Sequence, residues 1–447
     1  MKKTLALLCL GLLVLGVCVP PAGAAAIGDL SYGADLRYRQ TSFEDVPLRN
    51  GGAIGFWSFF RIRPRVWAQY QISDNMLVRA MVTNEFRKWM EPEHRASYKF
   101  PDEVLVDNLY LDMKSLAGNR LDLRIGRQNL IYGTGKIILD GTPGDGSRTI
   151  YLDAVKATWK GFANMSVDLL GIYDFAENPL AVNASKLNLT NLTPADVDRE
   201  ANELGLGVYA KHKGLRGVPF EAYYLYKQEA EFTLASGAKN PAVSYSTLGA
   251  RLMPKLSGNL TGNLELAYQM GSADNIDLSG YMVDAKVTMA MPAMGRVKPT
   301  TSVGLYLLSG NDPGTADKDE AWRPPFSRWP QYSELYIYSY AADRGSVADW
   351  QNVMMPYVEC GTVLADNLSS TALLGYMTAM QDDGPGDGKA RGLLFTWWNK
   401  FNIAKGLLRE KDSLAGHLLI EAVRPGNYYV SKTASQFYRW ELVYTIQ

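Results

Sequence analysis

Apolar and polar residues alternate one by one through several long stretches of this sequence. Near the C-terminus, Tyr438, Trp440 and Leu442 fall on one face of an extended strand, while Arg439 and Glu441 fall on the other. Alternation with a period of two predicts β-strands that have one apolar and one polar face. The same period runs through residues 30–39, 60–69, 260–270 and 281–289.

The apolar faces of these segments carry Trp and Tyr close to the strand ends. A soluble sandwich of two sheets also has alternating strands. A barrel in an outer membrane differs because girdles of aromatic residues border its apolar outer face. We therefore predict an all-β fold, a single transmembrane antiparallel up-and-down β-barrel that contacts outer-membrane lipid.

Short and long connections alternate between the predicted strands. Outer-membrane barrels have short periplasmic turns and long extracellular loops. Eight turns and nine loops predict about 18 strands. The range is about 16 to 20 strands, chiefly because residues 334–340 could form another strand. An even number of strands places both chain ends in the periplasm. The predicted turns are 73–75, 117–119, 162–163, 213–218, 257–258, 292–297, 365–367 and 405–413, and the predicted loops are 41–54, 89–102, 132–149, 175–202, 230–243, 271–279, 310–351, 381–390 and 425–435.

The first 24 residues have the organisation of a secretory signal. Lys2 and Lys3 precede an apolar run that ends at Val19, and the small residues of 22–24 follow. This order predicts a cleaved signal peptide over 1–24 and a mature barrel over 25–447. Cys18 leaves open a lipoprotein anchor, although Val17 is bulkier than the residue that normally precedes a lipidated cysteine.

Composition excludes several other classes of protein. The 46 basic and 46 acidic residues balance, which argues against a nucleic-acid partner. Cys360 is the only cysteine after the predicted signal, so an intramolecular disulfide and cysteine-based metal or haem motifs are excluded. We see no linker or change in composition after the signal, and we expect one domain without metal or other cofactor.

Basic residues are frequent on the polar faces of the first strands. Arg61, Arg63 and Arg65 occupy successive positions of one face, and Arg37 and Arg39 belong to the preceding strand. An arginine-lined lumen would attract anions and could bind carboxylates in a bidentate manner. Inward acids such as Asp35, Asp168, Glu265 and Glu441 support the alternative of a charge-neutral structural lining. The predicted pore-lining and substrate-binding residues are Arg37, Arg61, Arg63, Arg65, Arg79, Arg124, Arg127, Lys156 and Arg251.

Signals for catalysis are weak. Ser413 and His417 are close in sequence, but a nucleophile also needs a third, orienting group. Four acids between Asp312 and Glu320 lack the ligand spacing of a known calcium loop. We expect no catalytic residues and no metal site.

Three segments resemble the alginate-export porin family of outer membranes. The first is Leu123–Gln128, followed by Tyr132-Gly133 and Asp153–Lys156; the second is Ser309–Pro313, followed by Pro324–Phe326 and Tyr332; the third is Gly416-His417, followed by Arg424–Tyr428. The resemblance spans most of the predicted mature chain in the same order. It implies an 18-stranded barrel whose basic lumen selects an acidic polysaccharide.

The matching candidates for that selection are Arg61, Arg63, Arg124, Arg127 and Lys156. Arg127 would point to lipid in strict alternation, unless a bulge near Gly126 turns it inward. Lys156 stands where the family tends to carry arginine, which weakens bidentate recognition of carboxylates.

These observations predict an outer-membrane channel for passive transport of anionic solutes, with export of an acidic polysaccharide such as alginate as the specific case. Loop 310–351 is the candidate for a lid or a constriction. A polymeric substrate would imply a periplasmic delivery partner. Two alternatives stay open: a general porin without polymer specificity, and a scaffold barrel around a separate protein such as an electron-transfer subunit.

Overall fold

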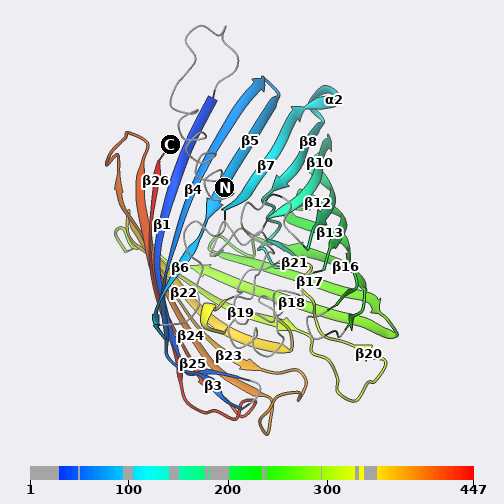
Figure 1. The fold of residues 1–447 in the computed structure, drawn as a ribbon, viewed down its shortest axis with the longest axis vertical. Coiled ribbons are helices and arrows are strands. Elements are labelled where there is room, and N and C mark those ends of the chain that lie inside the picture. Colours follow the sequence, from blue (N-terminus) through cyan, green and yellow to red (C-terminus); the bar gives the residue numbers. More distant parts are fainter. Residues whose placement is uncertain are drawn as a thin grey trace.

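The computed structural model describes residues 30–48, 51–93, 104–139, 151–176, 180, 201–233, 237, 239–292, 294–327, 332–336 and 350–446. The predicted signal peptide lies outside these residues. Within them, a closed antiparallel barrel forms the molecule (Figure 1). No helix in the described part of the chain is long and apolar enough to span a membrane.

Eighteen barrel strands are found in the described ranges, as the alternation and the connections predict. Strands that are neighbours in sequence are neighbours in the sheet. The last strand, β26, pairs with β1, with Ala34 opposite Ile446 at one end and Glu44 opposite Gln436 at the other, and this pairing closes the barrel. The strands are β1 (Leu30–Glu44), β4 (Trp57–Ser73), β5 (Met76–Asn84) continued by β6 (Phe86–Glu91), β7 (Val104–Ser115), β8 (Leu121–Gln128), β10 (Leu152–Phe162), β11 (Met165–Asp174), β12 (Glu203–Leu215), β13 (Val218–Glu229), β16 (Val243–Leu252), β17 (Leu260–Ala273), β18 (Ile276–Ala290), β19 (Thr300–Leu308), β22 (Val353–Ala365), β23 (Leu368–Thr378), β24 (Ala390–Lys405), β25 (Ser413–Pro425) and β26 (Ser435–Ile446).

The two faces of the wall separate as a barrel requires. On β1, Leu36 and Tyr38 are 49% and 38% exposed on the outer face, while Arg37 and Arg39 are buried on the inner face. Tyr38 stacks on Phe60 of β4 with ring centroids 5.3 Å apart, as part of an outer aromatic group. An apolar outer surface suits lipid, and a polar inner surface suits water.

The third strand is interrupted where it faces a proline. Pro64 of β4 keeps its register with β1, opposite Leu36. On the other side, β4 pairs with β5 up to Thr83 and with β6 from Phe86. Because proline has no N–H group to donate to this ladder, the break between β5 and β6 lies opposite it.

All eight predicted turns connect strands at one end of the barrel, where α2 (Leu116–Asn119) and the end of β26 also lie (Figure 1). The predicted loop 271–279 is wrong. Strand β17 continues to Ala273 and β18 begins at Ile276. A tight turn joins the two strands, and in it Asp274 has a φ of 53°. Beyond the membrane both faces of a hairpin meet water, so its polar sequence resembles that of a loop.

The turn between β24 and β25 is organised by a buried carboxylate. Asp412 accepts hydrogen bonds from the backbone N–H groups of Leu407, Leu408 and Arg409, at 2.6, 2.6 and 2.9 Å, and from the Tyr444 hydroxyl. Burial alone would raise the pKa of Asp412, but these hydrogen bonds outweigh it and lower the pKa to about 2.

A depressed carboxyl pKa contributes stability above the pKa of the unfolded chain, near 3.8. That contribution is lost as the pH falls from about 4 towards about 2. We expect Asp412→Asn to flatten the pH dependence of the urea midpoint in this window. Asp366→Asn, in another turn where the side chain is 89% exposed, is the matched control. Equal pH profiles for wild type and Asp412→Asn would contradict this assignment.

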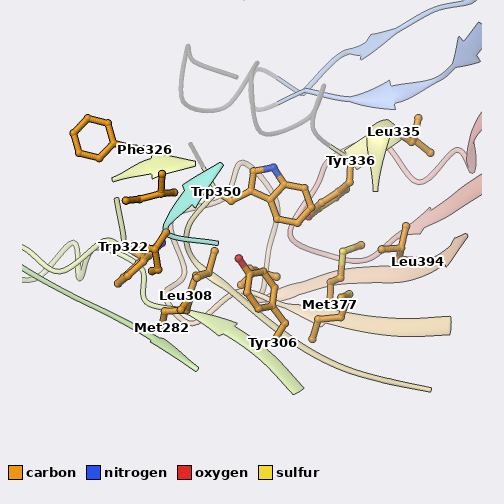
Figure 2. Packing of buried hydrophobic residues seen from close by; sticks show 14 of the residues in the cluster. Met282, Tyr306, Leu308, Trp322, Phe326, Leu335, Tyr336, Trp350, Met377 and Leu394 are labelled. Carbon is orange, nitrogen blue, oxygen red and sulfur yellow. The ribbon is translucent and has the colours of Figure 1, made fainter. Parts of the chain in front are cut away.

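Part of two long loops lies inside the barrel and forms an apolar core with the wall. β9 (Ile138–Leu139), in the connection after β8, pairs in parallel with β21 (Phe326–Ser327), in the connection after β19. Figure 2 shows this core, in which Trp322 and Trp350 lie beside wall residues. The barrel strands contribute inward-facing side chains to this core that are apolar, unlike the polar side chains found elsewhere on the inner face. They include Met282, Leu308, Met377 and Leu394.

The remaining short strands lie in other connections between barrel strands. β2 (Val46–Pro47) pairs with β3 (Ala53–Ile54), and β14 (Phe232–Thr233) pairs with β15 (Lys239–Asn240). β20 (Lys318–Asp319) adds to β18 in parallel.

Candidate functional site: the charged lining of the barrel

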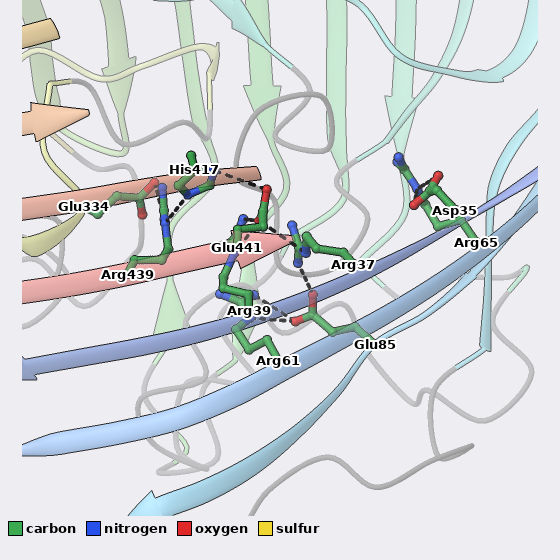
Figure 3. Close-up of polar contacts among 10 residues, drawn as sticks. All are labelled: Asp35, Arg37, Arg39, Arg61, Arg65, Glu85, Glu334, His417, Arg439 and Glu441. Carbon is green, nitrogen blue, oxygen red and sulfur yellow. Dashed lines mark hydrogen bonds and ion pairs between the residues drawn. The ribbon is translucent and has the colours of Figure 1, made fainter. Parts of the chain in front are cut away.

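A group of arginines, which we call the arginine wall, lines the inner face where β1, β4 and β26 meet (Figure 3). Arg37 and Arg61 both bind Glu85 of the third strand, at 2.5 and 2.9 Å. Arg39 binds Glu441 of β26 at 2.6 Å. The arginine wall consists of Arg37, Arg39, Arg61, Arg63, Arg65 and Arg439, all with side chains at most 19% exposed.

The arginine wall is largely neutralised by carboxylates. Arg65 binds both oxygens of Asp35, at 3.0 and 2.9 Å. Arg439 binds Glu334, which belongs to the loop between β19 and β22, at 2.9 Å. Six arginines therefore lie among five acids, which are Asp35, Glu85, Asp107, Glu334 and Glu441.

A second arc of charged residues follows the inner face from β5 to β16. Arg124 lies 2.8 Å from Asp112, Lys156 lies 3.6 Å from Asp168, and Arg251 lies 3.2 Å from Glu221. Arg79 differs from these three, because its guanidinium lies 4.5 Å from the centre of the Trp67 ring and donates to Gln69. The structure thus brings the predicted residues to the inner face in two separate groups.

Arg127 is the exception among the predicted lining residues. β8 keeps an unbroken register with β7 and β10, so no bulge near Gly126 turns Arg127 inward in these pairings. Arg127 shares the outward phase of Ile125, is 2% exposed, and binds Asp153 through two hydrogen bonds of 2.8 Å. The expectation that Arg127 lines the pore is therefore wrong: it joins β8 to β10 on the outer face.

Carboxylates of the wall hold the first inner loop, which we define as residues 129–139. The Tyr132 hydroxyl donates to Asp168 at 2.7 Å, and Lys136 forms an ion pair with Asp284 at 2.9 Å. Burial, with Asp168 beside it, raises the pKa of Tyr132 above its ordinary value, so the hydroxyl keeps its proton for this bond. Alternation identifies Asp168 as an inward acid, but its contact with this loop joins residues distant in sequence and was not predicted.

The second inner loop, described over 321–327 and 332–336, has an anchor on the opposite side. Glu421 of β25 accepts the Ser333 hydroxyl at 2.7 Å and the N–H groups of Glu334 and Leu335 at 3.0 and 2.8 Å. Tyr332 donates to Asp284 at 2.9 Å. Residues 334–336 form a helical turn, and 337–340 of the alternative strand lie outside the described residues. The two inner loops meet in the lumen and narrow it.

The residues that were candidates for catalysis or for calcium binding do not form such sites. His417 contacts Arg439 at 3.0 Å and Glu441 at 3.3 Å, whereas Ser413 lies four residues away on the same strand, about 13 Å along it. Asp319 pairs with Arg323, and Glu320 accepts hydrogen bonds from Thr315. The described residues hold no group of three side chains suited to a metal ion.

Comparisons with known proteins address both family and fold. A family model described as "Alginate export" matches residues 29–376. A search of curated proteins found no match. Among solved structures, OccK2 (OpdF) of Pseudomonas aeruginosa in complex with glucuronate is 10% identical with a TM-score of 0.55, covering 94% of this chain and 96% of that chain.

Two further structures agree with this result. OccK5 (OpdH) of Pseudomonas aeruginosa is 11% identical with a TM-score of 0.54, covering 93% of this chain and 98% of that chain. A BenF-like porin from Pseudomonas fluorescens Pf-5 is 11% identical with a TM-score of 0.55, with the same coverage. At such identities the likeness concerns the fold, a closed outer-membrane barrel.

Proposed function

The chain belongs to the alginate export family, and we propose on that premise that it is a passive channel for anionic solutes, with an acidic polysaccharide such as alginate as its polymeric substrate. It is an outer-membrane porin-type barrel and not an enzyme. Fixed basic side chains would attract the carboxylates, and inward acids would limit their dwell time so that the solute can leave.

The observation that carries this proposal is the basic lining of the inner face. Arg124, Lys156 and Arg251 keep partly exposed side chains towards the lumen even though each faces an acid. OccK2 was solved with glucuronate, a sugar acid. We propose sugar acids or their polymers as the solute class here, and a periplasmic delivery partner if the solute is a polymer.

The two alternatives differ in what they require of the interior. A scaffold barrel needs space for a separate protein, and this barrel's own loops fill part of its lumen through the core around Trp322 and Phe326. A general porin needs only a wet passage without affinity for a polymer. The loop core favours a channel over a scaffold, and affinity separates the two kinds of channel.

The deciding measurement is the reversal potential of the purified barrel in a planar bilayer under a salt gradient, before and after adding polyuronate. We expect an anion-selective current that the polymer blocks. Cation selectivity, or anion selectivity without any block, would favour a general porin. A barrel that conducts no current under any voltage would favour the scaffold.

A further inference from the structure

Most cations at inward positions of the barrel face a carboxylate. Arg124 pairs with Asp112, Lys286 pairs with Glu359, and Arg251 pairs with Glu221. A paired cation that is partly exposed still attracts an anion in the lumen, but more weakly than an unpaired cation. Inward cations that lack an acidic partner should therefore contribute most per residue to the selection of anions.

Near the short turns, three inward cations of the described residues contact aromatic rings instead, and we call them the mouth cations: Arg79, Lys211 and Lys400. Arg79 lies 4.5 Å from the Trp67 ring centre, and the Lys211 ammonium lies 4.7 Å from that of Tyr132. The Lys400 ammonium lies 5.0 Å from the ring centre of Trp398. Across the residues that the structure describes, no carboxylate comes within 4.0 Å of any of the three.

The alternation of side chains along each strand places all three cations on the inner face. Arg79 shares the phase of Met81 and Thr83, which are 5% and 1% exposed. Lys211 is two residues from the buried Tyr209 on β12. Lys400 lies opposite His417 in the pairing of β24 with β25.

The mouth cations lie near the same end of the barrel. Each lies within five residues of the end of its strand at the short turns, namely Met76 of β5, Leu215 of β12 and Lys405 of β24. These are the third, eighth and sixteenth barrel strands in the described order, so the cations are spread around the circumference. The short turns mark this end as the periplasmic mouth.

An aromatic ring positions a cation without cancelling its charge. The ring attracts the cation through its quadrupole, a weak interaction at exposed sites, and it carries no net charge. The full positive charge therefore stays available to an anion. Three separate single cations provide several weak contacts, which suits a chain with many carboxylates better than a small molecule that needs one tight clamp.

Space for such a chain adjoins Lys400. A cavity of about 390 Å³ opens beside it, and Ser369, Asn402 and His417 contribute polar groups to its lining. Two acids also line it, of which Glu441 is paired with Arg39 and Asp366 with Arg296. Ser369, Lys400 and His417 lie in one row across β23, β24 and β25. Hydroxyl and amide groups next to a cation are suited to a sugar ring that carries a carboxylate.

We propose that the mouth cations Arg79, Lys211 and Lys400 capture the carboxylates of a sugar-acid polymer at the periplasmic mouth. This assignment rests on the proposed function, because it names the residues that make the first contact with the polymer. The arginine wall then serves mainly to hold β1, β4, β26 and the second inner loop together.

The test is block of the single-channel current by polyuronate added to one side of an oriented barrel. The triple variant Arg79→Gln, Lys211→Gln, Lys400→Gln is expected to need about tenfold more polymer for half-block from the periplasmic side, since each exposed charge contact contributes little by itself. The conservative triple Arg79→Lys, Lys211→Arg, Lys400→Arg should block like the wild type. Heat-modifiable migration in gels verifies that each variant is folded.

A matched control removes a neutral pair instead. Lys286→Gln with Glu359→Gln deletes an inward cation and its acid, and should leave the block unchanged. If the glutamine triple is blocked like the wild type, the mouth cations are not the capture residues although the proposed function stands. If polyuronate fails to block the wild type itself, the proposed function and this assignment are both overturned.

Discussion

Glu421→Ala is expected to free the second inner loop and to raise the frequency of high-conductance openings by about tenfold to a hundredfold in planar bilayers. The carboxylate of Glu421 accepts three hydrogen bonds from Ser333, Glu334 and Leu335. A hydrogen bond to a charged group contributes about 1.5–3 kcal/mol, and water replaces the other partners of the released loop, so the net loss is that of about one such bond, or roughly tenfold to a hundredfold in population. Loss of this anchor should therefore shift the loop towards its released state.

The control for this variant is Glu359→Ala. Glu359 is also an inward carboxylate, but it binds Lys286 of the wall and neither inner loop. Its removal should alter selectivity without adding openings. If both variants show the same frequency of high-conductance openings, Glu421 does not hold the constriction closed.

A large loss of stability is expected for Glu441→Ala. Glu441 is 7% exposed and binds Arg39 at 2.6 Å, with Arg37 at 3.8 Å and His417 at 3.3 Å. Removing one partner of a buried ion pair leaves an uncompensated charge and costs about 3–5 kcal/mol. Urea unfolding of the barrel in lipid vesicles measures this free energy.

The comparison is with an exposed pair of the same barrel. Asp122 and Lys160 form an ion pair at 2.8 Å, with side chains 28% and 41% exposed. Asp122→Ala should reduce the free energy of unfolding by less than about 1 kcal/mol, because water screens exposed pairs. Similar losses for Asp122→Ala and Glu441→Ala would mean that water reaches the arginine wall.

The strands and turns were predictable because their signals are local. Alternation such as that of 436–446 depends only on which face meets lipid, and short turns interrupt it at regular intervals. The hairpin at Asp274 escaped prediction because no lipid-facing residue is required above the membrane. Arg127 was misplaced because the family resemblance was followed against strict alternation, which points it outward, and the register stays unbroken.

The basic residues that face the lumen could be predicted from the sequence, but which acids pair with them could not. Alternation identifies Arg37 and Arg61 as inward residues, but Glu85 joins them only through the register of three strands. Glu334 comes from a loop whose path depends on an apolar core with distant strands. Neutralisation of a charge is thus a tertiary property, and a sequence pattern alone overestimates how basic the lumen is.

The seam between the first and last strands has a consequence for how the barrel is assembled. Arg39 and Glu441, which bridge it, are 402 positions apart in the chain. A chain without β26 would expose the unpaired edges of β1 and β25, and such edges pair readily with other chains. High contact order also slows folding. The whole chain must therefore reach the periplasm before closure, and in transit it depends on factors that keep its edges apart.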